Sequence, residues 1–453
     1  MRAREGRLIL YFVIAAAALL LAACGKNRAG QGGGGGGGSV AAPAAGVLPV
    51  AEATAPKRTL APLPARELTP ELRSARARAM ADASRLRGLA WRGEVGMTPL
   101  SAWEFGTRAA ELADALGAED LQTLGRLAVA GGILPPGTDL AATAVGFTAA
   151  TAGAFYSPLD RQVIVRAEGT GSAAAKKHAL LTHEFVHALQ DQHFDLLGLL
   201  LAKPYNFDRA EAAFALVEGD ATVVQRRVEQ GDAFARRTLE EVARAEDARF
   251  DSYRREVGWL FPALLTETFV FRYRDGARFV ETLRRGRPAM GADELFRRPP
   301  VSTEQVLHPE KYLAGEAPRE VSLNVEGLTN DGWRASGSTP LGEIGVRGLL
   351  LGRVAAARAT RAAAGWGGDL AGLFEREGHA PLFVWKSVWD TAADAREFFA
   401  AYGAPHRRAG ASTQTREEVW REGAALTLVR LEGDAVLVIR GAEDDVRAAA
   451  RMF

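Results

Sequence analysis

The chain has 453 residues, of which 47% are hydrophobic and 25% charged, and its formal net charge is +1. Two or three folding units are expected, because single hydrophobic cores stop growing at about 250–300 residues. The composition is that of a globular protein, and the near-zero charge argues against a nucleic-acid-binding protein, which usually carries a strong basic excess.

The first residues have the features of an export signal. Three arginines precede an apolar run from Leu8 to Ala23, which predicts a signal peptide over residues 1–23. The run ends in LAAC, and Cys24 is the only cysteine in the chain. This ending resembles a bacterial lipobox, and the resemblance implies cleavage before Cys24 and lipidation of that residue. We therefore expect an exported protein that is lipid-anchored to a membrane of the bacterial cell envelope.

Residues 24–69 are predicted to form a flexible tether. They are rich in glycine, alanine and proline and include the run GQGGGGGGGSV. Such a segment buries too little apolar surface to fold. Because the chain has one cysteine, no internal disulfide can form, and the folded part must be stabilised by core packing.

Residues 70–150 are predicted to be a helical region. In TPELRSARARAMADASRLRGL, Thr69 has the position of a helix N-cap and Pro70 that of the first helical residue. Two more helical segments follow, in AWEFGTRAAELADALG and AEDLQTLGRLAVAGG, and the second of them ends at Gly131 and Gly132.

Residues 151–330 are predicted to form the central unit. AGAFYSPLDRQVIVRAEG indicates two short strands around a turn. Helical periodicity then runs through HALLTHEFVHALQDQHF, and another helix is expected from Asp208 to about Glu229. FPALLTETFVFRYRDGARFVETLRRG is also predicted to be helical, whereas PPVSTEQVLHPEKYLAGE has the composition of a loop.

Residues 331–453 alternate strand and helix patterns, as in PLFVWKSVWD, DAREFFAAYG and AVLVIRG. They predict a small α+β unit, and the fold class of the chain is therefore α+β. Trp366 and Asp369, in the segment GWGGD, are expected to pack and turn.

The segment LTHEFVHALQDQH holds three of the seven histidines and contains HExxH, from His183 to His187. On a helix, residues four apart share a face, so both imidazoles can bind one zinc ion at about 2.0–2.1 Å. Glu184, beside the first histidine, can take the proton from a water that the metal activates and pass it to the leaving amine. The motif predicts one Zn²⁺ per chain with Glu184 as general base. The alternative is a core helix whose histidines only form hydrogen bonds, which would bury Glu184 without a partner.

Two residues compete for the third protein ligand. His193 has the spacing of the metzincin motif HExxHxxGxxH, but Gln190 stands where that motif has glycine. On a continuous helix His193 would point about 240° around the axis from the second histidine. Glu218, in ALVEGDAT on the next helix, would complete a His2Glu site with one open position. Glu211 and Asp220 are alternatives to it.

HEFVHALQDQHFDL followed by LVEGDAT resembles the gluzincin-type HExxH zinc metallopeptidases of bacteria and archaea, many of them predicted lipoproteins. FPALLTETFVFRYRDGARFV, STEQVLHPEKY and GWGGD resemble further segments of such proteins, so the resemblance covers most of residues 85–402. It implies a zincin-like core with His183, His187 and Glu218 as zinc ligands and Glu184 as catalytic base.

This sequence departs from better-known gluzincins at one position. They often carry an aspartate four residues after the third ligand, where it orients a histidine, and here that residue is Thr222. We expect Asp191 or Asp220 to supply this support instead.

A group that stabilises the developing oxyanion is expected opposite the base. His308 and Tyr312 are the candidates, because Pro309 forces His308 out of the helical conformation. A purely structural loop is the alternative, and Tyr205 and Tyr253 are weaker candidates.

The strand at residues 161–165 precedes the HExxH helix. It is interpreted either as an edge strand that pairs with an extended substrate or as a core strand.

These observations predict a secreted, lipid-anchored zinc metallopeptidase that hydrolyses bonds in a peptide or protein substrate. The rival prediction is a catalytically inactive zincin-fold protein that serves binding or assembly in the cell envelope. The intact HExxH motif favours the first. No nucleic-acid partner is expected, and the oligomeric state is left open.

Overall fold

The structure is a computed structural model, and it describes residues 60–116, 118–167, 174–287, 291–407 and 416–453. The predicted signal peptide, Cys24 and the first part of the predicted tether lie outside these residues. No helix in the described ranges combines the length and the apolar character needed to cross a membrane.

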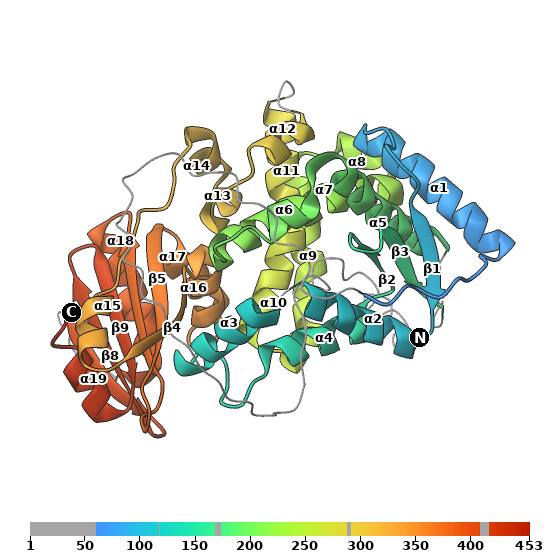
Figure 1. The fold of residues 1–453 in the computed structure, drawn as a ribbon. Coiled ribbons are helices and arrows are strands. Elements are labelled where there is room, and N and C mark those ends of the chain that lie inside the picture. The colour runs from blue at the N-terminus through green and yellow to red at the C-terminus, as the bar shows by residue number, and fades with distance from the viewer. Residues whose placement is uncertain (1–59, 117, 168–173, 288–290, 408–415) are drawn as a thin grey trace, which may run out of the picture.

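The predicted α+β fold is confirmed. Figure 1 shows a bundle of helices in the middle of the molecule, with a three-stranded sheet at one end and a six-stranded sheet at the other, where the C-terminus lies. The two sheets have strand orders β1-β3-β2 and β4-β5-β6-β9-β8-β7.

The N-terminal region is helical, as predicted, but contains one strand that the sequence analysis missed. Its elements are α1 (Pro70–Arg87), β1 (Gly96–Leu100), α2 (Ala102–Ala115), α3 (Ala118–Ala130) and α4 (Leu140–Thr151). Thr69 caps α1 and Pro70 begins it, as expected. The chain already packs on the body before α1, since Arg108 donates to the carbonyl of Ala61 (2.9 Å) and Arg66 pairs with Glu104 (2.6 Å).

The small sheet corrects one interpretation of the sequence. The predicted hairpin is present as β2 (Ala154–Ser157) and β3 (Gln162–Arg166), and β3 also pairs in parallel with β1. The strand at 161–165 therefore lies in the centre of the sheet and has no free edge. The edge next to the HExxH helix is β2, whose four residues are buried.

The central helices follow the predicted order. They are α5 (Ala174–Phe194), α6 (Leu196–Leu200), α7 (Phe207–Gln230), α8 (Asp232–Arg236), α9 (Leu239–Val257), η3 (Gly258–Leu260), α10 (Ala263–Val270), the π-helical turn η4 (Phe271–Asp275) and α11 (Gly276–Gly286). Three short helices come next: α12 (Ala292–Arg297), α13 (Thr303–Leu307) and α14 (Pro309–Ala314). The last two occupy the segment that had been interpreted as a loop.

The C-terminal region is an α+β unit, as predicted. Helix α15 (Val325–Asn330) precedes this region, whose elements are β4 (Arg334–Thr339), α16 (Gly342–Leu351), α17 (Ala356–Ala363), β5 (Trp366–Glu375), β6 (Leu382–Trp389), α18 (Ala392–Tyr402), η5 (Ala404–His406), β7 (Glu417–Glu422), β8 (Ala425–Glu432), β9 (Ala435–Gly441) and α19 (Glu443–Ala449). GWGGD begins β5 rather than forming a turn. Asp369 there accepts bonds from the backbone N–H of Leu341 and from the indole of Trp366.

Helix α7 lies between α5 and α11, and two glycines set its distance from α11. A Cβ on Gly219 would overlap the backbone of Gly276, and a Cβ on Gly276 would overlap the carbonyl of Ala215. The backbones of α7 and α11 can approach this closely only because both positions lack a side chain. The contact fixes α7 at the residue next to Glu218.

The glycine contact gives a stability prediction. Gly219→Ala should lower the free energy of unfolding by about 1–3 kcal/mol, because the new methyl group forces two helices apart. The matched control is Gly146→Ala, at an exposed helical position with nothing within 4 Å of the added carbon. It should raise the free energy of unfolding by about 0.5–1 kcal/mol. Urea denaturation of the three proteins measures both changes, and a Gly219→Ala protein as stable as the wild type would contradict the contact.

Candidate metal centre

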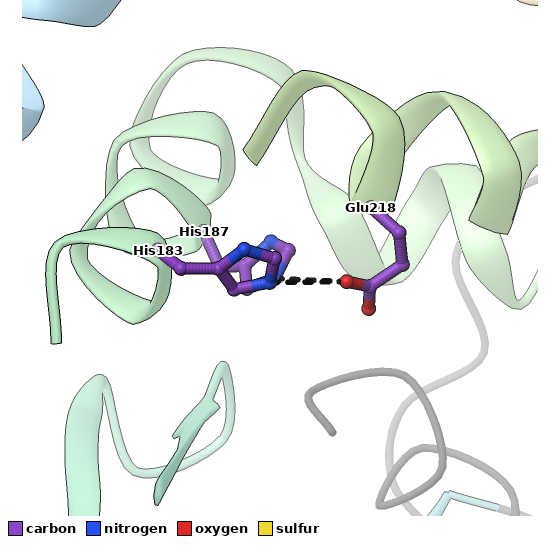
Figure 2. A group of neighbouring side chains, drawn as sticks. All are labelled: His183, His187 and Glu218. Carbon is purple, nitrogen blue, oxygen red and sulfur yellow. Dashed lines mark hydrogen bonds and ion pairs between the residues drawn. The ribbon is translucent and has the colours of Figure 1, made fainter. Parts of the chain in front are cut away.

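The HExxH helix and the following long helix bring the three predicted ligand residues together. His183 and His187 project from α5, and Glu218 projects towards them from α7 (Figure 2). Nε2 of His183 lies 3.0 Å from Nε2 of His187 and 3.2 Å from Oε2 of Glu218, and the remaining distance, from His187 to Glu218, is 3.5 Å.

These distances match the edges of a zinc coordination polyhedron. Ligand atoms at about 2.0–2.1 Å from a tetrahedral zinc ion are about 3.3 Å from one another. The three observed separations of 3.0, 3.2 and 3.5 Å lie on either side of that value. The side chains thus stand in the arrangement that a shared ion requires.

The cluster is buried and its polar atoms are not all satisfied by the protein. His183 and His187 are 3% and 2% exposed, and Glu184 and Glu218 are 0% exposed. Nδ1 of His183, Oε1 of Glu184 and Oε1 of Glu218 have no hydrogen-bond partner among the described residues. Buried polar atoms are seldom left in this state. Two imidazoles, a carboxylate and unsatisfied oxygens form the donor set that suits zinc.

The electrostatics of the cluster favour a cation at its centre. Burial opposes the ionised form of Glu218, but the imidazoles of His187 and His183 outweigh it and hold the pKa of this carboxyl well below its usual range. Burial also opposes the charged form of His187, yet Glu218 raises the pKa of His187 to about 9. Burial lowers the pKa of His183. Glu218 is therefore a carboxylate, and positive charge beside it is stabilised.

Glu184 is held by one oxygen only. The backbone N–H of Tyr156, on β2, donates to its Oε2 (2.9 Å), while its Oε1 is unpaired. Burial, with the nearby carboxylate of Glu218 adding to it, raises the pKa of Glu184 well above the usual value. The bond from β2 orients the carboxyl group and leaves one oxygen available for a proton.

Gln190 determines which nitrogen of His187 faces His183 and Glu218. Its Nε2 donates to the carbonyl of Val217 (3.0 Å) and to the carboxylate of Asp220 (2.9 Å), and both can only accept. Its Oε1 must then face Nδ1 of His187 (2.8 Å), so Nδ1 carries a hydrogen and Nε2 is directed towards the ligand cluster. Arg87 completes the chain of contacts, because its Nε lies 2.5 Å from Asp220.

Several expected alternatives are resolved by these contacts. His193 remains on α5 and bonds to the carbonyl of Ala90 (2.8 Å), so the metzincin alternative is wrong. Glu211 pairs with Arg272 instead of joining the cluster. Of the two residues expected to support a histidine, Asp220 acts through Gln190, whereas Asp191 accepts a bond from the hydroxyl of Tyr156 (2.9 Å).

The two residues expected to stabilise an oxyanion have other partners. His308 lies 3.0 Å from Glu343, and the hydroxyl of Tyr312 donates to the carbonyl of Arg298 (2.8 Å). The segment that carries them contacts α7 at Asp208, whose carboxylate accepts two hydrogen bonds from Thr303. Asp208 precedes Glu218 by ten residues, or about 15 Å of helix. The structure thus gives His308 and Tyr312 partners outside the cluster of His183, His187 and Glu218.

Tyr273 is a neighbour of the site that the sequence analysis did not identify. It is buried in η4, and its ring stacks on that of His183 with centroids 6.0 Å apart and planes 21° apart. Of the weaker candidates, Tyr253 packs on Phe269, which in turn packs on Tyr273. The placement of Tyr273 depends on the extra residue of a π-helical turn, which sequence periodicity does not reveal.

Among the described residues, a second group of side chains that could hold a metal ion differs from the cluster of His183, His187 and Glu218. Glu304, Glu316 and Asp390 lie close together, and only Glu304 is buried. The ammonium of Lys311 contacts all three at 2.6–2.7 Å. A cation of the protein itself therefore already balances these carboxylates.

Comparison with known proteins yields one match. A sequence family described as a domain of unknown function (DUF8575) matches residues 329–450. No curated protein and no solved structure matches the chain. The match covers the C-terminal α+β region, and the ligand cluster lies outside it.

The contact of Gln190 with His187 gives a prediction about metal affinity. Gln190→Ala should lower the affinity for zinc by about 10–100-fold, because His187 loses the group that fixes its orientation. The control is Gln192→Ala, whose side chain lies on the same helix but bonds to the backbone of Arg92 and Gly93. Competition with a chromophoric chelator measures both affinities. Equal affinities of Gln190→Ala and the wild type would refute the orienting role.

The pair of His308 and Glu343 gives a prediction about pH. The hydrogen bond to Glu343 raises the pKa of His308 above 6.5. The hydrogen bond between His308 and Glu343 therefore stabilises the folded protein fully at pH values below the pKa that His308 has in the unfolded chain. This stabilisation is lost as the pH rises through the pKa that His308 has in the folded protein. The stability difference between wild type and His308→Gln should be larger at about pH 6 than at about pH 9. Denaturation at both pH values tests this. A pH-independent difference, together with impaired hydrolysis, would return His308 to the list of catalytic candidates.

Proposed function

We propose that the protein is a zinc metallopeptidase that hydrolyses peptide bonds. The observation that carries this proposal is the convergence of His183, His187 and Glu218 at separations of 3.0–3.5 Å, with Glu184 beside them. Three protein ligands are typical of catalytic zinc sites, which keep one position for water or substrate.

The residues divide the chemistry between them. His183, His187 and Glu218 would hold the ion. When bound, zinc supplies Lewis acidity, which polarises a carbonyl group and makes water acidic enough to react near neutral pH. Glu184 accepts the proton of the attacking water on its free Oε1 and then delivers that proton to the nitrogen of the leaving amine. The N–H of Tyr156 holds the other oxygen during both transfers.

The burial of the site favours a second candidate function. A zinc ion that only stabilises the fold would also be enclosed, and the protein would then be a non-catalytic binding or assembly protein. Structural zinc sites, however, are usually closed by four protein ligands. The proposed site has three, and the fourth nearby group, Glu184, is bonded to β2 instead. For this reason the peptidase is the better proposal, although a peptide can reach the site only if the covering elements separate.

The proposed location rests on the sequence alone. We propose an exported protein that is attached to a membrane of the cell envelope through lipidated Cys24. The glycine- and proline-rich segment that follows would set the distance of the folded body from that membrane.

The proposed reaction gives a direct test. The full chain should contain one zinc per molecule, and Glu184→Gln should keep that zinc while losing about 10²–10⁴-fold in hydrolysis, because the proton acceptor is removed. Glu94→Gln, with a side chain 97% exposed, is the control and should keep full activity. Metal analysis and cleavage of a fluorescent casein measure the two properties. A wild-type chain without zinc, or a Glu184→Gln chain with full activity, would disprove the proposal.

A further inference from the structure

A basic pocket lies apart from the proposed metal centre, beside α12 at the top of Figure 1. The C-terminal ends of α1 and α11 and the short helix α12 surround a volume of about 680 Å³. None of the residues that line it is a proposed zinc ligand or takes part in the proposed proton transfers. The charged residues of the wall are four arginines and two acids, namely Arg87, Arg284, Arg287, Arg297, Asp293 and Glu294.

Arg87 has one nitrogen without a partner at this pocket. Its side chain is only 4% exposed. Its Nε bonds to Asp220 (2.5 Å) and its Nη1 to Asp293 (2.7 Å), whereas Nη2 has no hydrogen-bond partner among the described residues. Nη2 carries two N–H donors, and buried donors are seldom left without an acceptor. An oxygen atom of a ligand would supply the acceptor that the protein does not provide.

The guanidinium of Arg87 is already held in place by the protein. Besides its two carboxylate partners, it lies 5.9 Å from the ring centroid of Phe194 and 5.7 Å from that of Phe296. These two rings stack on each other, with centroids 4.6 Å apart. Because the side chain is ordered in advance, a ligand that binds it loses little free energy in fixing its conformation.

The other arginines leave the pocket with an excess of positive charge. Arg297 pairs with Glu294 (3.4 Å), while Arg284 and Arg285 share the carboxylate of one buried glutamate. Arg287 is exposed and forms no ion pair within the part of the chain that the structure describes. The guanidinium of Arg287 and Nη2 of Arg87 are thus the basic groups that the protein leaves open for a ligand.

A role in helix stability does not account for all of these arginines. Two helices, α1 and α11, end at the pocket, and basic residues in the last turn of a helix balance the partial negative charge there. Exposed charge is sufficient for that purpose. It does not require a guanidinium enclosed by two carboxylates and two aromatic rings, with one nitrogen unpaired. This feature of Arg87 favours a binding site.

The open groups suit a phosphate. A phosphate monoester carries about 1.5–2 negative charges near neutral pH and has three acceptor oxygens, whereas a carboxylate has one charge and two oxygens. Arginine is well matched to phosphate because its planar guanidinium presents donors side by side. Sites for whole small molecules measure about 300–1,000 Å³, so a volume of about 680 Å³ has room for more than the phosphate itself.

We propose that this pocket binds the phosphate group of a small molecule or of a phospholipid, with Arg87 at its inner wall and Arg287 at its mouth. The inference does not depend on the peptidase function, because neither zinc nor hydrolysis enters it.

The first experiment is calorimetric titration of the full-length protein with glycerol 3-phosphate. Arg287→Gln should weaken binding about tenfold, because one hydrogen bond between charged groups is lost. The matched control is Arg255→Gln, at an exposed arginine of α9 that also lacks an ion pair among the described residues and does not line the pocket. It should bind as the wild type does. Equal affinities of Arg287→Gln and the control, or a wild-type dissociation constant above about 1 mM, would overturn the proposal.

The second experiment tests the inner contact. Arg87→Lys keeps the positive charge, but a lysine cannot hold two carboxylates and a third acceptor in one plane, so the affinity should fall about tenfold or more. Arg284→Gln, at a side chain 31% exposed, should also weaken binding and replaces the lysine variant if that protein does not fold. An unchanged affinity in the folded variant would overturn the proposal.

Metal analysis of the same samples separates the pocket from the metal centre. Arg287→Gln should contain as much metal as the wild type, since no lining residue belongs to the cluster of His183, His187 and Glu218. A variant that loses metal and phosphate binding together would place the phosphate on the metal and overturn the proposal. If the wild type binds glycerol 3-phosphate but contains no metal, the pocket stands and the peptidase function falls.

A comparison of membranes distinguishes the two sources of phosphate. The titration is repeated with the protein on vesicles of phosphatidylcholine, with and without phosphatidylglycerol. If the anionic headgroup is the ligand, phosphatidylglycerol should weaken the apparent affinity for glycerol 3-phosphate in Arg255→Gln but not in Arg287→Gln. If a soluble phosphate is the ligand, the affinity should be the same on both vesicles. Acetate that binds as tightly as glycerol 3-phosphate would overturn the assignment to phosphate.

Discussion

The structure depends on one buried carboxylate. Glu218 is fully enclosed, and Oε2 of its carboxylate lies against the imidazoles of His183 and His187. Removing a charged group from water costs several kcal/mol even after relaxation, and only opposite charge and hydrogen bonds offset that cost. A divalent cation supplies far more opposite charge than one proton on an imidazole. The interior is thus arranged so that a metal ion would contribute to the stability of the fold as well as to the chemistry.

Helix α7 is built to keep that carboxylate in place. Gly219 allows the backbone of α11 to touch it on one side, and α5 packs on the other. Buried ion pairs stand before and after Glu218, with Glu211 bonded to Arg272 and Arg226 bonded to Glu246. Because these neighbouring charges are already paired, they do not compete with the histidines for Glu218. The glutamate that lacks an arginine partner is the one that faces the imidazoles.

The sequence predicted the candidate ligand cluster because the patterns that indicate it are local. HExxH on one helix and a charged EGD within an apolar helix are visible in the printed letters, and the structure places His183, His187 and Glu218 together. The residues that were missed depend on long-range or irregular geometry. Gln190 orients His187 only because α7 provides Val217 and Asp220, and Tyr273 reaches His183 only through a π-helical turn. Likewise, β3 lies in the centre of the three-stranded sheet only because β1 pairs with it, and sequence periodicity did not reveal β1.

The C-terminal region supports the site from a distance, although the sequence showed no site there. Arg347, on α16, is buried and pairs with Asp275 (3.1 Å) and Glu267 (2.8 Å). Asp275 ends the π-helical turn that carries Tyr273, and Glu267 belongs to α10, which runs directly into that turn. Residues 329–450, the part that matches a family of unknown function, include α16. Since a buried arginine without its carboxylates is strongly unfavourable, these ion pairs hold α16 against the turn that carries Tyr273, whose ring stacks on His183.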